Sequence, residues 1–336
     1  MGPLDSRSGR DLVEQVYDHR IRGMGVIMVQ AERRMHVHAG CWFMLASVAP
    51  PTLIVAIPQE FAASTLIPES GRFTVSLVAE DQMRVVDQFF AGVATPEDFL
   101  PGTLVTAPSG QPSLGGSLGI FDCAVVGRWD LGDFLLVAGA VQAAGAERPG
   151  VANLTVNAIQ ARADAPPKMV LPRRALPAPL LAPPGVALDE SAAAVYARRR
   201  FGPVLVVAGS TGAVAEAVTR AAVQVSHDPP RFLWAVPEAD TLGVALTSGG
   251  GWSLSLTEGD AGRDEPGRWV EGAVSLCWVD EEPMPDGSRP YFAGVGPERL
   301  KAPTMPHDAL WLGRVEHFGR GGADRSSLRA GAGQSR

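Results

Sequence analysis

His36 and His38 are the side chains in this sequence that could most directly hold a metal ion. They alternate, so on an extended strand both imidazoles project from the same face. Two such histidines could ligate a metal or a haem iron. No carboxylate and no third histidine stands at metal-ligand spacing, so the pattern favours the absence of a metal site.

Other catalytic chemistries find little support among the reactive residue types. Cys41, Cys123 and Cys277 are far apart and odd in number, which argues against a disulfide framework or a structural zinc site. No Gly-x-Ser-x-Gly turn suggests a hydrolase nucleophile, and neither glycine-rich phosphate-binding motif is present. Glu80 and Asp81 follow an expected strand and are interpreted as a helix cap rather than a catalytic carboxylate pair.

An internal repeat organises the chain, because many residues recur at a constant offset of 179 positions. Val16-Tyr17, for example, returns as Val195-Tyr196. Further pairs at this offset are Arg20 and Arg199, Gly23 and Gly202, Ser47 and Ser226, Pro50 and Pro229, Ala56 and Ala235, Phe73 and Trp252, and Asp81 and Asp260. Beyond Asp81 the copies differ in length, and we align the next strand of the first copy with the segment that begins near Gly272. A repeat of this kind determines the whole domain organisation.

Each copy is expected to contain several short strands and few helices. In the first copy, β-branched and apolar runs separated by Gly, Pro or charged turns predict strands, and these are 26–29, 44–46, 52–57, 73–78, 121–126 and 134–140. Short helices are expected at 11–22, at 62–68 and after Asp81. So many short strands without a βα alternation indicate a mainly β barrel or sandwich.

These patterns divide the chain into two domains, a linker and a tail. The first barrel is predicted at 11–162 and the second, more divergent barrel at 189–319. The proline-rich segment 163–188 is expected to run extended over the surface without joining a sheet. The segment 320–336 lacks apolar anchors and is predicted to be a disordered tail.

The overall composition limits the partners. Of the 336 residues, 46% are hydrophobic and 19% are charged, with a formal net charge of −7. The negative charge argues against a nucleic-acid surface. No signal peptide and no apolar run of about 18 residues is evident, so no membrane association and a cytoplasmic location are expected.

Several segments in a fixed order resemble the flavin-reductase-like, FMN-binding split-barrel family. They are SVAPPTLIVAIP (47–58), ASTLIPESGRFTVSLVAEDQ (63–82) and LGDFLLVAG (131–139), with SHDPPRFLWAVP (226–237) and GGGWSLSLTEGD (249–260) in the second copy. The resemblance covers nearly all of the first copy and about two-thirds of the second. It implies two tandem split β-barrels that pack on each other as an intramolecular pseudo-dimer.

The same resemblance implies FMN as cofactor and a nicotinamide, NAD(P)H, as transient electron donor. The implied flavin-binding positions are Gly40, Cys41, Trp42, Ser47, Ser64, Thr65, Thr219, Arg220, Gln224 and Ser226, and His307 is the candidate proton donor. Trp42 and Cys41 would flank the flavin, and the alternative is that both are core residues. Arg220 would grip the phosphate or else be a solvated arginine, and His307 is otherwise a solvated loop residue. The family histidine of Gly-Asp-His is replaced here by Phe134.

Three functions remain open at this point. The first is an FMN-dependent oxidoreductase or flavin reductase, acting as a monomeric pseudo-dimer or as a homodimer. The second is a degenerate barrel that binds a small ligand or a partner without redox turnover. The third is a haem-binding split barrel.

Overall fold

The structure is a computed structural model in which two units of the chain can be described separately, Arg22–Arg200 and a second unit that includes Phe201–Arg336. The described residues are 23–90, 103–145, 148, 151–155, 158–159, 176–177, 191, 204–210, 213–219, 222–227, 230–237, 241–247, 251–256, 290–295, 298–300, 308–314 and 317–320. The expected helix at 11–22, the tail beyond 320, Arg220 and His307 therefore lie outside the described residues.

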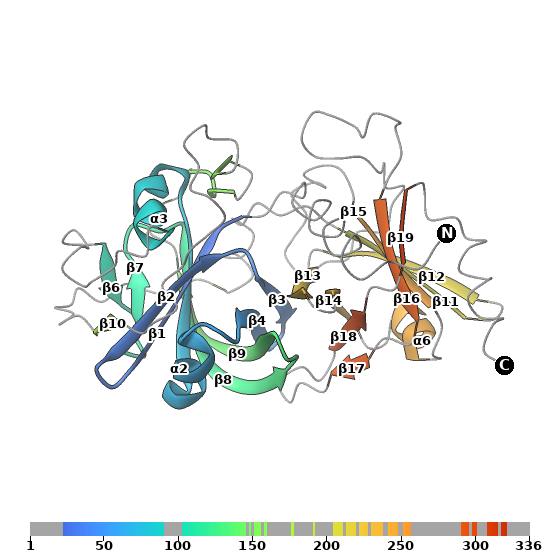
Figure 1. Cartoon of the computed structure of the whole chain (residues 1–336), viewed down its shortest axis with the longest axis horizontal. Helices are drawn as coiled ribbons and strands as arrows, with labels where there is room; N and C mark the ends of the chain where they lie inside the picture. The colour runs from blue at the N-terminus through green and yellow to red at the C-terminus, as the bar shows by residue number, and fades with distance from the viewer. Residues whose placement is uncertain are drawn as a thin grey trace. The chain divides into compact units, whose positions relative to one another are not determined.

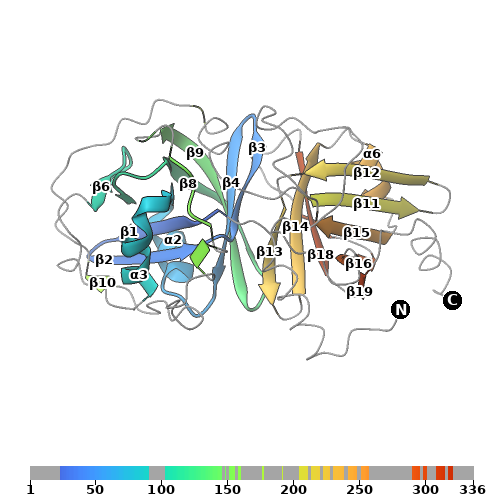
Figure 2. The same ribbon diagram turned by 90° about the horizontal axis from the view of Figure 1, so that it is seen from above.

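The first unit is built on one antiparallel eight-stranded sheet in the order β10-β2-β1-β5-β8-β9-β4-β3. Figure 1 shows β1 and β2 as a long blue hairpin, and Figure 2 shows β4 beside β9. The strands are β1 (Gly25–Ala31), β2 (Arg34–Gly40), β3 (Phe43–Val48), β4 (Pro51–Pro58), β5 (Arg72–Leu77), β8 (Gly119–Asp130), β9 (Phe134–Gly145) and β10 (Leu176–Pro177). A separate pair, β6 (Leu104–Thr106) and β7 (Pro112–Leu114), completes the unit.

Strand β4 is buried on both faces of the sheet. In β4, Leu53, Val55 and Ile57 belong to the main core cluster, together with the rings of Phe43 and Phe73. The intervening residues face the other way and are also fully buried, which explains why β4 reads as a continuous apolar run. We call the second surface the outer face, and its members are Met44, Ile54, Ala56, Leu136 and Ala138.

Glycines permit two close approaches in this core. A β-carbon on Gly25 would lie 2.5 Å from Cε1 of Phe43, and one on Gly139 would lie 2.5 Å from Cζ of Phe73. Both rings are fully buried, so neither can swing into solvent to make room. Residues larger than glycine are therefore excluded at these positions unless the facing ring becomes smaller.

The helices of the first unit lie near the predicted positions. Helix α2 (Ala63–Ser70) confirms the expected helix at 62–68, and it ends at Gly71, whose φ of 66° suits glycine. Helix α3 (Met83–Phe90) follows a 3-10 turn at Glu80–Gln82. The interpretation of Glu80-Asp81 as the cap was wrong, because the Gln82 side chain accepts the bond from the Ala79 N–H at 3.0 Å.

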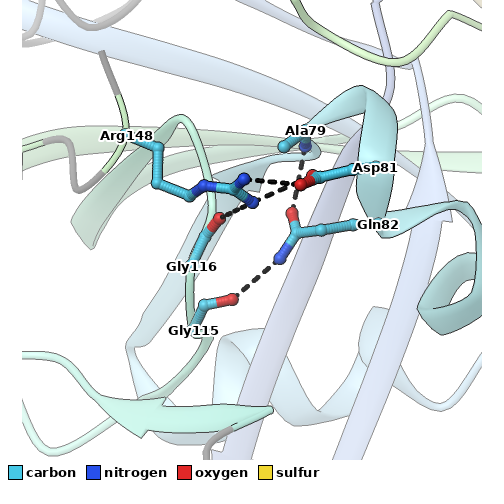
Figure 3. Close-up of polar contacts among 6 residues, drawn as sticks. All are labelled: Ala79, Asp81, Gln82, Gly115, Gly116 and Arg148. Atoms are coloured by element: carbon cyan, nitrogen blue, oxygen red, sulfur yellow. Dashed lines mark hydrogen bonds and ion pairs between the residues drawn. The ribbon is translucent and has the colours of Figure 1, made fainter. Parts of the chain in front are cut away.

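Asp81 instead forms an ion pair with Arg148, 67 residues away (Figure 3). Arg148 donates two hydrogen bonds to the carboxylate, at 2.9 and 2.5 Å, and a third to the carbonyl of Gly116. The hydrogen bond from Arg148 lowers the pKa of Asp81. Gln82 also donates to the carbonyl of Gly115, so these side chains link the start of α3 to the turn after β7.

The chain just after Arg148 fastens two neighbouring strands of the sheet together. Asn153 donates to the carbonyls of Met24 and Val78, and the neighbouring backbone pairs with both strands through Leu154. These hydrogen bonds satisfy backbone groups of Met24 and Val78 beyond the last strand pairing between β1 and β5. The segment 151–155 therefore fastens the start of β1 to the end of β5.

The described residues of the second unit form two sheets, in the orders β12-β11-β15-β16-β19 and β13-β14-β18-β17. Its elements are β11 (Val204–Ser210), β12 (Ala213–Thr219), β13 (Ala222–His227), β14 (Pro230–Pro237), α6 (Thr241–Thr247), β15 (Gly251–Leu256), β16 (Pro290–Val295), β17 (Glu298–Leu300), β18 (Asp308–Arg314) and β19 (His317–Arg320). Buried side chains of β14 include Phe232 and Trp234.

Five strands of the second unit have bounds that lie 179 residues after those of five strands in the first. They are β11 to β15 in chain order, which match β1 to β5. The pairing registers match as well, since Gly25 faces Gly40 and Val204 faces Thr219. The irregularity between Leu45 and Ser47 recurs between Gln224 and Ser226.

Two details of the sequence interpretation were wrong. The linker was expected to join no sheet, but Leu176–Pro177 forms β10 and pairs with Met35 and Arg34 of β2. Proline is tolerated there because β10 lies at the sheet edge. The strand that pairs with β15 is β16, so the alignment with the segment near Gly272 placed this strand too early. Among the described residues, no helix is long and apolar enough to cross a membrane.

Candidate functional site

Five aromatic and imidazole rings gather where β2 turns into β3. We call this group the aromatic corner, and its members are His36, His38, Trp42, Phe61 and Phe134. The rings come from β2, from the β2–β3 connection, from the residues before α2 and from the start of β9. The cluster therefore joins positions that are nearly 100 residues apart in the sequence.

Trp42 is the only half-buried ring of the aromatic corner, and it is held on two sides. It stacks on His38 with a centroid distance of 5.6 Å and an interplanar angle of 20°, and it meets Phe134 edge-on at 5.3 Å. Its carbonyl accepts a hydrogen bond from the Ala56 N–H at 2.8 Å. An indole fixed in this way presents a planar surface on which another planar ring system can stack.

His38 is fully buried between two of these rings. Its ring stacks on Trp42, and its centroid also lies 5.1 Å from that of the Phe61 ring. Burial, and then the neighbouring His36, lower the pKa of His38 to about 3. The imidazole is therefore neutral near pH 7, with one nitrogen that donates and one that accepts. Neither nitrogen has a hydrogen-bond partner within the described part of the chain.

Gly40 and Cys41 lie between His38 and Trp42 in the sequence and differ in what they offer. A β-carbon on Gly40 would lie 3.0 Å from Nε2 of His38, so glycine leaves the space beside this nitrogen without a side chain. Cys41 is buried and forms no disulfide. Its carbonyl accepts from the Phe43 N–H at 2.9 Å, which tightens the connection that carries Trp42.

Ser47 lies at the irregularity of β3, where the pairing with β4 shifts between Leu45 and Ser47. The serine is buried, and its hydroxyl has no hydrogen-bond partner among the described residues. A buried hydroxyl of this kind is costly unless another group bonds to it. Ser47 therefore suits a role in binding a polar group.

Ser64 and Thr65 stand in the first turn of α2, and their hydroxyls are already used. The Ser64 hydroxyl lies 2.8 Å from the carbonyl of Phe61 and 3.0 Å from that of Gln59, either of which can accept its hydrogen bond. The Thr65 hydroxyl donates to the carbonyl of Ala62 at 3.0 Å. A phosphate accepts hydrogen bonds, so these hydroxyls would have to turn away from the carbonyls to bind it.

The predicted site residues of the second copy are described only in part. Thr219 ends β12, and Gln224 and Ser226 lie in β13, where Ser226 is buried. Arg220 and His307 lie outside the described residues. At the 179-residue offset, His38 and Trp42 correspond to Ala217 and Ala221, so the second copy lacks the imidazole and the indole of the aromatic corner.

The two histidines of β2 remain a pair without further metal ligands in the described ranges. No group of three or more His, Cys, Asp or Glu side chains that could hold a metal ion occurs there. Both imidazoles lie instead against the ring of Phe61. Both imidazoles thus take part in aromatic packing in this structure.

The first unit is similar to a known protein family. Residues 20–159 match the family model of the flavin reductase like domain. Nearly all of the matched residues lie in the first unit.

Named relatives agree with this assignment. FMN reductase (NADH) RutF of Methylorubrum extorquens (strain DSM 6343 / CIP 106787 / DM4) is 35% identical over 100 residues, which is 30% of this chain and 49% of the relative. Actinorhodin polyketide dimerase of Streptomyces coelicolor is 28% identical over 130 residues, 38% of this chain and 72% of the relative. The chain spans about half the length of the FMN reductases it matches.

Among solved structures, BorF, the flavin reductase component of a bacterial two-component tryptophan halogenase, aligns with 26% identity and a TM-score of 0.38. That alignment covers 43% of this chain and 89% of the other.

Proposed function

We propose that the chain is an FMN-binding oxidoreductase with NAD(P)H-dependent flavin reductase activity, and that the aromatic corner holds the flavin. The observation that carries the proposal is the half-buried indole of Trp42, fixed against His38 and Phe134 inside a flavin reductase like domain. FMN reductases that use NADH are among the relatives of this domain. Bound flavin would supply the hydride and electron transfer.

The residues of the first unit fit a flavin in three respects. Trp42 offers a planar stacking surface, and Gly40 carries no side chain that would crowd the His38 ring behind it. Ser47 contributes a buried hydroxyl that lacks a partner among the described residues. Cys41 would contribute through its backbone and its apolar bulk, because its side chain is buried. Ser64 and Thr65 would serve the phosphate only after their hydroxyls turn outward.

The second unit is, in this proposal, a divergent copy of the same split barrel. The strand bounds and registers support this, and so does a compensating exchange in the core. Gly25 and Phe43 of the first copy correspond to Val204 and Ala222 of the second, so the larger residue at one position accompanies the smaller one at the other. Such paired changes keep the core volume constant.

The two copies would pack on each other through their outer faces as an intramolecular pseudo-dimer. The outer face of the first copy is apolar throughout, and its counterparts in the second copy are also apolar and buried. These counterparts are Val223, Leu233, Ala235, Leu310 and Leu312. Isologous interfaces join equivalent surfaces, and fusion of two copies would convert such a dimer into a monomer.

The second copy would then contribute polar groups to the flavin site. Thr219, Arg220, Gln224 and Ser226 are the proposed contacts, with the guanidinium of Arg220 on the phosphate and His307 as proton donor. Since the second copy lacks an imidazole and an indole at the positions of His38 and Trp42, we place the aromatic wall of the site in the first copy alone.

Titration with FMN, followed by a turnover assay, tests the proposal. The purified chain should bind FMN saturably, as seen by quenching of flavin fluorescence, and should oxidise NADH or NADPH only when flavin is present. A chain that neither binds added FMN nor oxidises either nicotinamide would refute it and would leave a barrel without redox turnover. An absorption band of bound haem would refute it in favour of a haem protein.

A further inference from the structure

The β6–β7 hairpin forms a two-stranded sheet of its own and packs against β1 and β5 without joining the eight-stranded sheet (Figure 1). A two-stranded hairpin is at most marginally stable in water by itself, so its order depends on what it packs against. The base of the hairpin is anchored by apolar burial, because Leu114 and the following Leu118 belong to the core cluster. The tip lies at the surface, where Pro108 and Gly110 are exposed. The base is therefore anchored more deeply than the tip.

Side-chain hydrogen bonds hold the tip of the hairpin on the sheet. Ser109 donates twice to the carboxylate of Asp122 in β8, from its N–H at 2.8 Å and from its hydroxyl at 2.6 Å. The Gln111 side chain accepts from the Gln30 N–H at 2.7 Å and donates to the Gln30 carbonyl at 3.0 Å. Gln30 lies beyond Met28, the last residue of β1 that pairs with β5, so Gln111 takes the place of a strand partner there.

Asp122 is the member of these contacts that the sheet itself does not require. Its side chain is buried, and in the pairing of β5 with β8 it lies opposite Thr74. In the second unit, the residue 179 positions after Thr74 is Ser253, which pairs with Ala293 of β16. An alanine therefore suffices at this place between two paired strands. Since a buried carboxylate is costly unless it accepts hydrogen bonds, the bonds from Ser109 explain why Asp122 is tolerated.

We propose that the β6–β7 hairpin is a flap that opens from its tip as a unit, and that the contact between Ser109 and Asp122 is the latch that keeps it closed. Surface segments held by hydrogen bonds open at a lower free energy than core strands, and Leu114 keeps the base of the flap in place. Opening takes place in the ligand-free chain and does not depend on the proposed function. It uncovers polar groups of three neighbouring strands, which are the backbone of Gln30, the hydroxyl of Thr74 and the carboxylate of Asp122.

Amide hydrogen exchange in the full chain, without ligand, measures the opening. The reporters are the amides of Ala107 and Gly110, because both donate hydrogen bonds within the hairpin and neither donates to Asp122. The reference is the ladder between β4 and β9. In the wild type, the reporter amides should exchange on the order of tenfold faster than the ladder, or more. Equal rates would overturn the proposal, because the hairpin would then open only together with the sheet.

Asp122→Ala tests the latch. We expect it to accelerate exchange of the reporter amides by about tenfold to a hundredfold, the effect of losing hydrogen bonds to a carboxylate, and to leave the β4–β9 ladder unchanged. Asp130→Ala is the matched control, since Asp130 also belongs to β8 but is exposed and accepts from the turn residue Gly132. The control should change neither rate.

Two results would refute the latch: equal acceleration of the reporter amides and the ladder in Asp122→Ala, or no acceleration of either. If Asp122→Ala does not fold, Ser109→Ala decides, because it removes the hydroxyl donor at the half-buried tip and keeps the carboxylate. Acceleration of the reporter amides alone, by about threefold or more, supports the latch. Unchanged rates in Ser109→Ala refute it.

Discussion

One close core contact of the first copy, replaced by its counterpart from the second copy, gives the most quantitative test of the repeat. Gly25 and Phe43 face each other so closely that a β-carbon on Gly25 would lie 2.5 and 2.7 Å from two ring atoms of Phe43. The second copy has Val204 and Ala222 at the matching positions. If the copies share one core geometry, the first copy should accept this pair together but neither change alone.

The expected free energies follow from the structure. Gly25→Val forces a side chain into a fully buried ring, and overpacking of this kind destabilises by about 1–3 kcal/mol. Phe43→Ala removes that ring and should destabilise by about 3–5 kcal/mol. In the double variant the valine occupies part of the space left by the ring. The double variant should therefore be destabilised by about 1–3 kcal/mol less than the sum of the two single variants.

Urea denaturation of the four proteins measures this coupling as the departure from additivity. Gly139→Ala combined with Phe43→Ala is the matched control, because a β-carbon on Gly139 would meet Phe73 instead of Phe43. The control pair should be additive to within about 0.5 kcal/mol. Additive effects of Gly25→Val and Phe43→Ala would refute the compensating exchange and would leave the strand bounds and registers as the structural support for the duplication.

Three further predictions concern single side chains of the first unit. The pKa of His38 is lowered to about 3, so the stability that its neutral form gives the fold is complete above pH 6.5 and is lost as the pH falls toward 3. In urea denaturation, the free energy of unfolding of the wild type should fall by up to about 1.4 kcal/mol per pH unit more than that of His38→Phe. Equal slopes for the two proteins would contradict this. Trp42→Leu should weaken FMN binding by about threefold to tenfold in a fluorescence titration. The control is Trp129→Leu, which removes another half-buried indole of the first unit and should leave FMN binding unchanged. Equal losses of affinity in the two variants would contradict stacking on Trp42. Arg148→Ala should raise the pKa of Asp81 toward its ordinary value in an NMR titration of the carboxylate, and an unchanged pKa would show that the ion pair is absent in solution.

The strands of the first unit were predictable because their signal is local. β-branched and apolar residues between Gly and Pro turns indicated β4, β5 and β9 with errors of a few residues at the ends. The repeat also predicted which strands of the two copies correspond, because its 179-residue offset can be read from the sequence without knowledge of the fold. The edge strand β10 escaped prediction because two residues next to prolines carry no strand pattern of their own, and only pairing with β2 gives them one.

The candidate site was predictable in residue type but not in arrangement. Trp42 and Ser47 were identified from their place in the family pattern. Their surroundings were not, because Phe61 and Phe134 reach the aromatic corner only through the folded sheet. His38 was interpreted as a possible metal ligand because its spacing from His36 was visible in the sequence, while its stack with Trp42 was not. Asp81 was similarly interpreted as a cap because its partner Arg148 lies 67 residues further along the chain.

Equilibrium binding of FMN to the wild-type chain tests the central claim most directly. We expect saturable quenching of flavin fluorescence by the wild-type chain and a weaker affinity in Trp42→Leu, which loses the stacking surface. Absence of saturable binding, or binding that is unchanged in Trp42→Leu, would contradict a flavin site at the aromatic corner.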